Sequence, residues 1–251
     1  MAIFVFQHTD AEHLALLGKV LMRRRIPVRY FPLHRGAPLP SPEELWGEGG
    51  GLVVLGGPMG VYEADRHPWM GPGMRLIREA LRRDFPVYGL CLGSQLMAGA
   101  LGARVYPGRE KKEIGCFPVE LTAEGRADPL LAGEGGAFAV FQWHGDTFDL
   151  PAGAVRLASS ERYREQAFRS GGRGYAFQFH LEVEMEDVRR WLRVFAPDLV
   201  SPRSDADAAG VLARTPSFME EMNARAERLF SRWLALAGYP PKEPAGDPFA
   251  G

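Results

Sequence analysis

The sequence predicts an α/β fold in which a mostly parallel sheet carries helices on both faces, followed by a helical extension at the carboxyl end. Two observations support this fold class. Short apolar runs alternate with longer segments of helical period from the first residue to about Phe195. The chain also has 251 residues, of which 46% are hydrophobic, so it can bury a sizeable core. In such folds, functional residues gather at the carboxyl ends of the strands.

Strand and helix follow one another in order through the first half of the chain. The apolar runs expected to form buried strands are residues 2–6, 28–31, 51–55 and 85–90. Apolar residues at spacings of three and four predict a helix after the first strand, a second over 74–83 and a third over 92–101. The Thr9-x-x-Glu12 spacing is typical of a capping box and predicts the start of the first helix. A proline-rich passage occupies residues 32–42.

The pattern changes beyond Ala103. Glycine and charge clusters separate short strand candidates, which suggests antiparallel pairing at residues 116–121, 137–141, 155–159, 166–169 and 175–179. Helical period then returns up to Phe195. We expect a main domain of residues 1–196 and an extension of residues 197–251. In the extension, a helix beginning near Thr215 should dock on the main domain, and a proline-rich tail should follow it.

Composition and charge exclude several classes of protein. Because 30 Lys and Arg balance 31 Asp and Glu, no broad basic face is available and a nucleic acid is not expected as a partner. No apolar run approaches the roughly 18 residues that a membrane span needs. Both cysteines, Cys91 and Cys116, lie in apolar stretches and are expected to be free thiols. These features predict a cytoplasmic protein that does not enter a membrane.

Cys91 is the candidate nucleophile. It lies between a predicted strand and a predicted helix, with Gly89 and Gly93 two residues to either side. Such glycines permit the tight turn that lifts a nucleophile out of a sheet. At the start of a helix, the free N–H groups are expected to lower the pKa of the thiol and to favour the reactive thiolate.

A cysteine nucleophile needs an imidazole base, and two histidines have an acid two residues later. In an extended segment, residues i and i+2 share one face, so the acid can orient the ring. His180 and Glu182 follow an apolar strand and fit this geometry. His144 and Asp146 are separated by a glycine and indicate a turn. We therefore interpret His180 as the base, with His144 in reserve.

A glycine-rich loop, residues 56–60, follows the third strand. By itself it indicates a turn. Next to a nucleophile at the end of a neighbouring strand, such a loop can also point a backbone N–H at a developing oxyanion. The second donor would be the N–H of the residue after the nucleophile, Leu92.

Three motifs resemble the class I, or triad, glutamine amidotransferases. They are Gly-Leu-Cys-Leu-Gly-Ser-Gln at residues 89–95, the Gly-Gly-Pro loop, and Phe-His-Leu-Glu at residues 179–182. The likeness is greatest to the glutaminase domain of GMP synthase and its stand-alone relatives, and it covers most of residues 28–195. The motifs also occur in the order found in that family.

The resemblance implies a flavodoxin-like sheet and a triad of Cys91 as nucleophile, His180 as base and Glu182 as the orienting acid. It implies an oxyanion hole formed by the backbone amides of Gly57 and Leu92. The residues that it places beside the substrate are Gln95 and, in a segment similar to the His-Gly-Asp stretch of the family, Trp143, Gly145 and Asp146. The implied reaction is hydrolysis of the glutamine side-chain amide through a cysteinyl thioester, without a metal or organic cofactor.

One departure from GMP synthase limits what the resemblance implies. The ATP-using domain of that synthase carries a Ser-Gly-Gly-x-Asp-Ser loop, whereas the nearest string here, residues 170–174, lacks the acid and predicts a hairpin turn. Ammonia would then pass to a separate ATP-using synthetase chain. Alternatively, the same triad would act as a gamma-glutamyl peptidase, or the chain would be a catalytically silent binding subunit. A cysteine-dependent α/β-hydrolase fits less well, because its acid normally precedes its histidine.

Overall fold

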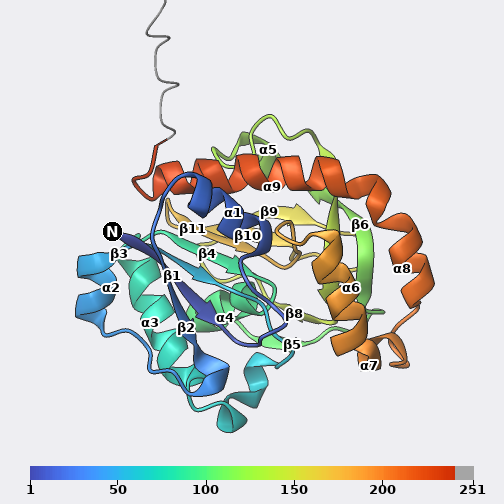
Figure 1. The fold of residues 1–251 in the computed structure, drawn as a ribbon, viewed down its shortest axis with the longest axis horizontal. Coiled ribbons are helices and arrows are strands. Elements are labelled where there is room, and N and C mark those ends of the chain that lie inside the picture. Colours follow the sequence, from blue (N-terminus) through green and yellow to red (C-terminus); the bar gives the residue numbers. More distant parts are fainter. Residues whose placement is uncertain (241–251) are drawn as a thin grey trace, which may run out of the picture.

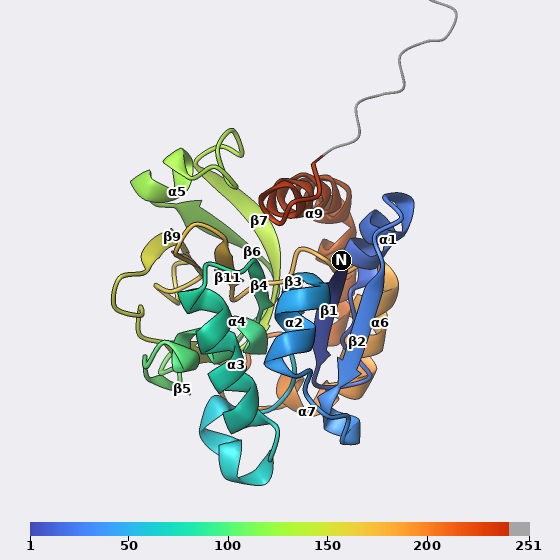
Figure 2. The same cartoon turned by 90° about the vertical axis from the view of Figure 1, so that its left-hand side faces the viewer.

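The computed structural model describes residues 1–240, and its main element is a nine-stranded sheet (Figures 1 and 2). In spatial order the strands are β2 (Val28–Pro32), β1 (Ala2–Gln7), β3 (Gly49–Val54), β4 (Val87–Leu90), β11 (Gly174–Phe177), β10 (Ala167–Ser170), β9 (Val155–Ser159), β6 (Glu113–Leu121) and β7 (Ala137–His144). A separate small sheet pairs β5 (Val105–Pro107) with β8 (Asp146–Phe148).

The first five strands in this order run parallel, and the remaining pairs are antiparallel. This arrangement confirms the predicted fold class. The expectation for residues 175–179 is only half right, because β11 pairs antiparallel with β10 but parallel with β4. The parallel pairing has a functional consequence, since it brings the carboxyl ends of β4 and β11 side by side.

Helices cover both faces of the sheet, as expected (Figure 2). One face carries α1 (Ala15–Arg23), α6 (Met185–Val194) and α9 (Pro216–Leu236). The other carries α2 (Pro42–Glu48), α3 (Met70–Arg82) and α4 (Leu92–Ala100). The shorter elements are the helices α5 (Ala123–Ala127), α7 (Ala196–Leu199) and α8 (Ala208–Arg214), and the 3₁₀ turns η1 (Leu33–Arg35) and η2 (Val61–Arg66).

The carboxyl-terminal helix α9 docks directly on the sheet. Its Phe230 and Trp233 are fully buried, stack with ring centroids 5.5 Å apart, and both meet the ring of Tyr88 on β4. In space, α9 therefore shares the core of the main domain, and the division of the chain after residue 196 stays a prediction. Residues 241–251, which include most of the predicted proline-rich tail, lie outside the described part of the chain.

The helix α2, which was not predicted, follows the proline-rich passage and begins with a capping box between Ser41 and Glu44. One local prediction is wrong. The Thr9-x-x-Glu12 pattern is not a capping box, because α1 starts only at Ala15 and has no side-chain cap. Thr9 instead accepts a hydrogen bond from the Ala11 amide, in a turn ahead of the helix. Between residues 1 and 240, no helix is long and apolar enough to cross a membrane.

Candidate active site

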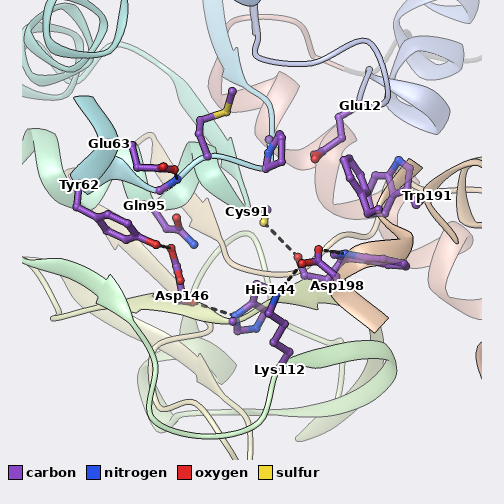
Figure 3. A pocket seen from close by; sticks show the side chains of 17 residues that line it. Glu12, Tyr62, Glu63, Cys91, Gln95, Lys112, His144, Asp146, Trp191 and Asp198 are labelled. Carbon is purple, nitrogen blue, oxygen red and sulfur yellow. Dashed lines mark hydrogen bonds and ion pairs between the residues drawn. The ribbon is translucent and has the colours of Figure 1, made fainter. Parts of the chain in front are cut away.

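Three neighbouring parallel strands, β3, β4 and β11, place the glycine loop, Cys91 and His180 at one edge of the sheet, whereas Trp143, Gly145 and Asp146 lie at the end of β7 and the start of β8. The glycine loop follows β3, Cys91 follows β4, and His180 lies three residues beyond β11. A cavity of about 190 Å³ opens at this edge (Figure 3). Cys91, Gly57, Gln95, Trp143, Gly145 and Asp146 all line it. Residues separated by more than 80 positions in the sequence thus meet at one cavity, as parallel strand order predicts.

Cys91 has the backbone geometry of a strained turn. Its φ of 49° and ψ of −109° lie where residues with a Cβ are rarely found. The flanking glycines are needed mainly for close packing: a Cβ on Gly93 would lie 2.0 Å from the Val54 carbonyl oxygen, and one on Gly89 would lie 2.9 Å from the backbone of Gly93. The helix α4 can therefore start directly against the sheet, while the strain falls on Cys91 itself.

Polar groups surround the Cys91 sulfur. The Trp143 carbonyl oxygen lies 3.8 Å away, and the Gln178 side-chain amide donates a hydrogen bond over 3.6 Å. Gln178 is held in turn by Gln95, whose amide donates to Gln178 Oε1 over 3.0 Å. Gln95 therefore contacts the nucleophile indirectly, through a second buried glutamine.

His180 and Glu182 form a buried pair. The Nδ1 of His180 donates to Glu182 Oε1 over 2.6 Å, and the two residues are only 1% and 4% exposed. The backbone of His180 exchanges two hydrogen bonds with Phe141 on β7. The edge of Trp191 packs on the imidazole, with ring centroids 4.6 Å apart. These contacts fix both the position and the tilt of the ring.

The ionisation of the pair differs from the simple expectation for a helix start. Burial raises the pKa of the Cys91 thiol, and hydrogen bonds from His180 and the Leu92 amide only partly oppose this effect. Burial alone would lower the pKa of His180, but Glu182 and Cys91 together raise it well above its ordinary value. The helix start therefore does not make the thiol acidic. Instead, Glu182 makes the imidazole of His180 a stronger base.

His144, the second candidate for the base, hydrogen-bonds to groups other than the Cys91 sulfur. Its Nε2 lies 3.2 Å from a carboxylate oxygen of buried Glu113, and its Nδ1 hydrogen-bonds to the Asp146 carbonyl over 3.0 Å. Both ring nitrogens are thus occupied away from the sulfur. The Asp146 carboxylate accepts a hydrogen bond from Tyr62 across the cavity over 3.0 Å. Burial and Asp146 raise the pKa of Tyr62 to about 12, so it remains a donor.

The glycine loop rests on His8, at the end of β1. The His8 Nδ1 donates to the Leu55 carbonyl over 3.0 Å, and the ring stacks on Trp69 with centroids 4.6 Å apart. Burial lowers the pKa of His8 to about 4, so the ring is neutral. Gly57 packs between His8 and Leu92, the first residue of α4. A Cβ on Gly57 would come within 3.0 Å of both side chains.

Comparison with known proteins places these features in a family. Residues 14–196 match the family described as glutamine amidotransferase class-I. The chain belongs to this family. It is 34% identical over 240 residues to the glutamine amidotransferase-like protein YfeJ of Salmonella typhimurium, covering 94% of this chain and 98% of that one. This confirms the resemblance seen in the sequence motifs.

Other known proteins are similar to part or nearly all of this chain. The GMP synthase (glutamine-hydrolyzing) of Thermomicrobium roseum is 37% identical over 134 residues, which are 53% of this chain but 23% of the synthase. The crystal structure of a glutamine amidotransferase from Thermotoga maritima superposes with a TM-score of 0.83 at 31% identity, covering 93% of this chain and 98% of that chain. One from Methylobacillus flagellatus gives 0.83 at 28% identity, covering 98% of each chain.

Several residues around this candidate site were not predicted from the sequence. They include His8, Glu12 and Gln178, and also Tyr62, Lys112, Trp191, Phe195 and Asp198, which line the cavity. Gln178 shares an extended segment with His180 and could have been found from the same i, i+2 spacing. His8 and Glu12 follow β1. They reach the site because β1 lies beside β3 in the sheet, which the sequence does not show. Within residues 1–240, no group of three or more His, Cys, Asp or Glu side chains could hold a metal ion.

Proposed function

We propose that this chain hydrolyses the side-chain amide of glutamine through a thioester on Cys91. The observation that carries the proposal is a cysteine in a strained turn that lines a cavity and hydrogen-bonds to an imidazole, which a buried carboxylate holds at 2.6 Å. His180 takes the thiol proton, the sulfur attacks the amide carbon, and His180 returns the proton to the departing ammonia. Glu182 keeps the ring oriented and strengthens it as a base.

Water then attacks the thioester with the help of the same imidazole and releases glutamate. Both steps pass through an oxyanion, and we assign its stabilisation to the backbone amides of Gly57 and Leu92. The support for this assignment is that Gly57 lines the cavity together with Cys91 and lies against the Leu92 side chain. We assign the glutamine-binding side of the cavity to Gln95, Trp143, Gly145 and Asp146.

We further propose that the ammonia passes to a separate ATP-using synthetase chain. The GMP synthase relatives support this idea, because the half of this chain that matches them corresponds to about a quarter of their length. Residues 1–196 would then be the amidotransferase domain, in agreement with the matched residues 14–196.

The test is release of glutamate and ammonia from glutamine by the parent, Cys91→Ala and Cys116→Ala. Loss of a triad nucleophile should lower kcat/KM by at least about 10³-fold, whereas the Cys116 variant should match the parent. Undiminished activity in Cys91→Ala would exclude the mechanism. A glutamine-like electrophile should also alkylate Cys91 faster than Cys116. Equal labelling of the two cysteines would favour a silent binding subunit.

A further inference from the structure

Glu12 lies in the cavity without an assigned role. It is 7% exposed and lines the same cavity as Cys91. Figure 3 shows its carboxyl group pointing into the cavity, with Cys91 between it and the side that carries Tyr62 and Gln95. The cavity therefore has two sides: one with the predicted glutamine contacts, and one with Glu12 and Trp191.

Hydrogen bonds tie the loop that carries Glu12 to Trp191 on α6, and tie the first turn of α1, which follows the loop, to Glu182. The Trp191 indole donates to the Ala11 carbonyl over 2.9 Å, and the Leu16 amide donates to the Glu182 carbonyl over 3.0 Å. The Gln7 side chain donates to the carbonyl of Glu12 itself over 3.0 Å. The position of the carboxyl group is therefore built into the fold.

The Glu12 carboxyl lacks the partners that a buried acid usually has. Its Oε2 is buried and has no hydrogen-bond partner within residues 1–240. A Cβ on Gly56 would lie 2.0 Å from this oxygen and 3.2 Å from His180 Cε1, so the carboxyl lies close to the imidazole edge, in space that the glycine leaves free. A buried, unpaired carboxyl is costly, and such groups concentrate where a ligand supplies the missing partner.

The direction of the reaction identifies that ligand. His180 must reach the nitrogen that leaves the acyl carbon, so this nitrogen comes to lie on the imidazole side of the sulfur, where Glu12 is. We propose that Glu12 is the binding residue of a leaving-group subsite, which holds the departing amine. The proposal rests on the proposed function and deepens it: the substrates are gamma-glutamyl amides of ammonia and of small primary alkylamines.

The proton balance of this step is complete. When the C–N bond breaks, His180 gives its proton to the nitrogen and a neutral amine forms. Burial raises the pKa of Glu12 to about 7, whereas an alkylammonium group has a pKa near 10. The amine therefore takes the Glu12 proton and becomes an ammonium ion paired with the carboxylate. After the ammonium ion leaves, the Glu12 carboxylate recovers a proton from water.

Two aromatic side chains form part of this side of the cavity. Trp191 and Phe195 line the cavity together with Glu12, and their rings pack edge-on with centroids 6.1 Å apart. An apolar wall beside one acid suits a cation with a short alkyl chain. Lys112 also lines the cavity, but its ammonium group is paired with the Asp198 carboxylate, so it is not free to bind a carboxylate-bearing leaving group such as an amino acid.

The experiment compares leaving groups in the parent, Glu12→Gln and the exposed control Glu220→Gln. Glutamine and gamma-glutamylethylamide release amines, whereas glutamate gamma-methyl ester releases methanol, which cannot become a cation. Glu12→Gln should lower kcat/KM for the two amides by at least about 10-fold and for the ester by less than about 3-fold. Glu220→Gln should change neither.

Two outcomes would overturn the amine subsite. An equal loss on amides and ester would mean that Glu12 acts only through His180 or the fold, and no loss at all would mean that it does not act. If the parent hydrolysed none of the three substrates, the proposed function would fail, and the subsite would be tested by binding. Ethylammonium should then slow alkylation of Cys91 by iodoacetamide in the parent but not in Glu12→Gln. Equal protection of both would refute the subsite.

Discussion

Replacing Glu12 by glutamine should make the protein more stable at alkaline pH. Burial raises the pKa of Glu12 from 4.5 to about 7, with a further increase from Glu182 and a partial decrease from His180. Because the folded pKa lies above the unfolded one, the stabilisation linked to this proton is complete below pH 4.5 and is lost as the pH rises through 7. The difference corresponds to about 3 kcal/mol at about 1.4 kcal/mol per pH unit.

The measurement is the free energy of unfolding of the parent and Glu12→Gln in urea at pH 4.5 and pH 8.5. Glutamine has the same shape and no charge, so the variant should gain about 3 kcal/mol on the parent between the two pH values. In thermal unfolding, this equals roughly 6–12 °C for a chain of this size. Glu220→Gln, an exposed change on α9, should follow the parent at both pH values.

A parent and a Glu12→Gln variant with parallel pH profiles would refute the reasoning. It would mean that the carboxyl ionises as easily in the folded protein as in the unfolded chain. A stabilising substitution that also removes amide hydrolysis would instead show that the site holds an unpaired acid at the expense of stability.

Two further changes test other parts of the structure. Burial holds the pKa of His8 at about 4, below 6.5, so its contribution to stability is complete above pH 6.5 and is lost as the pH falls towards 4. His8→Asn should therefore lose about 3 kcal/mol less than the parent between pH 7.5 and pH 4, and identical acid profiles in urea unfolding would contradict this. Trp233→Ala should cost about 3–5 kcal/mol, because the side chain is fully buried between α9 and the sheet, whereas Phe218→Ala, which is 39% exposed, should cost less than about 1 kcal/mol. Similar losses for the two variants would argue against α9 as part of the core.

The sequence alone determined the fold class and the family. The alternation of apolar runs and helical segments predicts a parallel sheet. It can be recognised from the sequence because strand and helix patterns depend only on local spacing. The position of Cys91 between a strand and a helix could also be predicted from the neighbouring residues alone. The pairing of His180 with Glu182 also followed from spacing, since residues two apart share a face in any extended segment.

Only the tertiary structure decided which of several plausible side chains meet at the cavity. His144 has an acid two residues later, as His180 does, but Glu113 on β6 occupies its ring. Glu12 has the spacing of a helix cap, but long-range bonds to Trp191 and Glu182 hold its loop against the triad and turn the side chain into the cavity. For both residues, the local sequence pattern does not tell whether the side chain belongs to the site. Contacts between distant segments of the chain decide it.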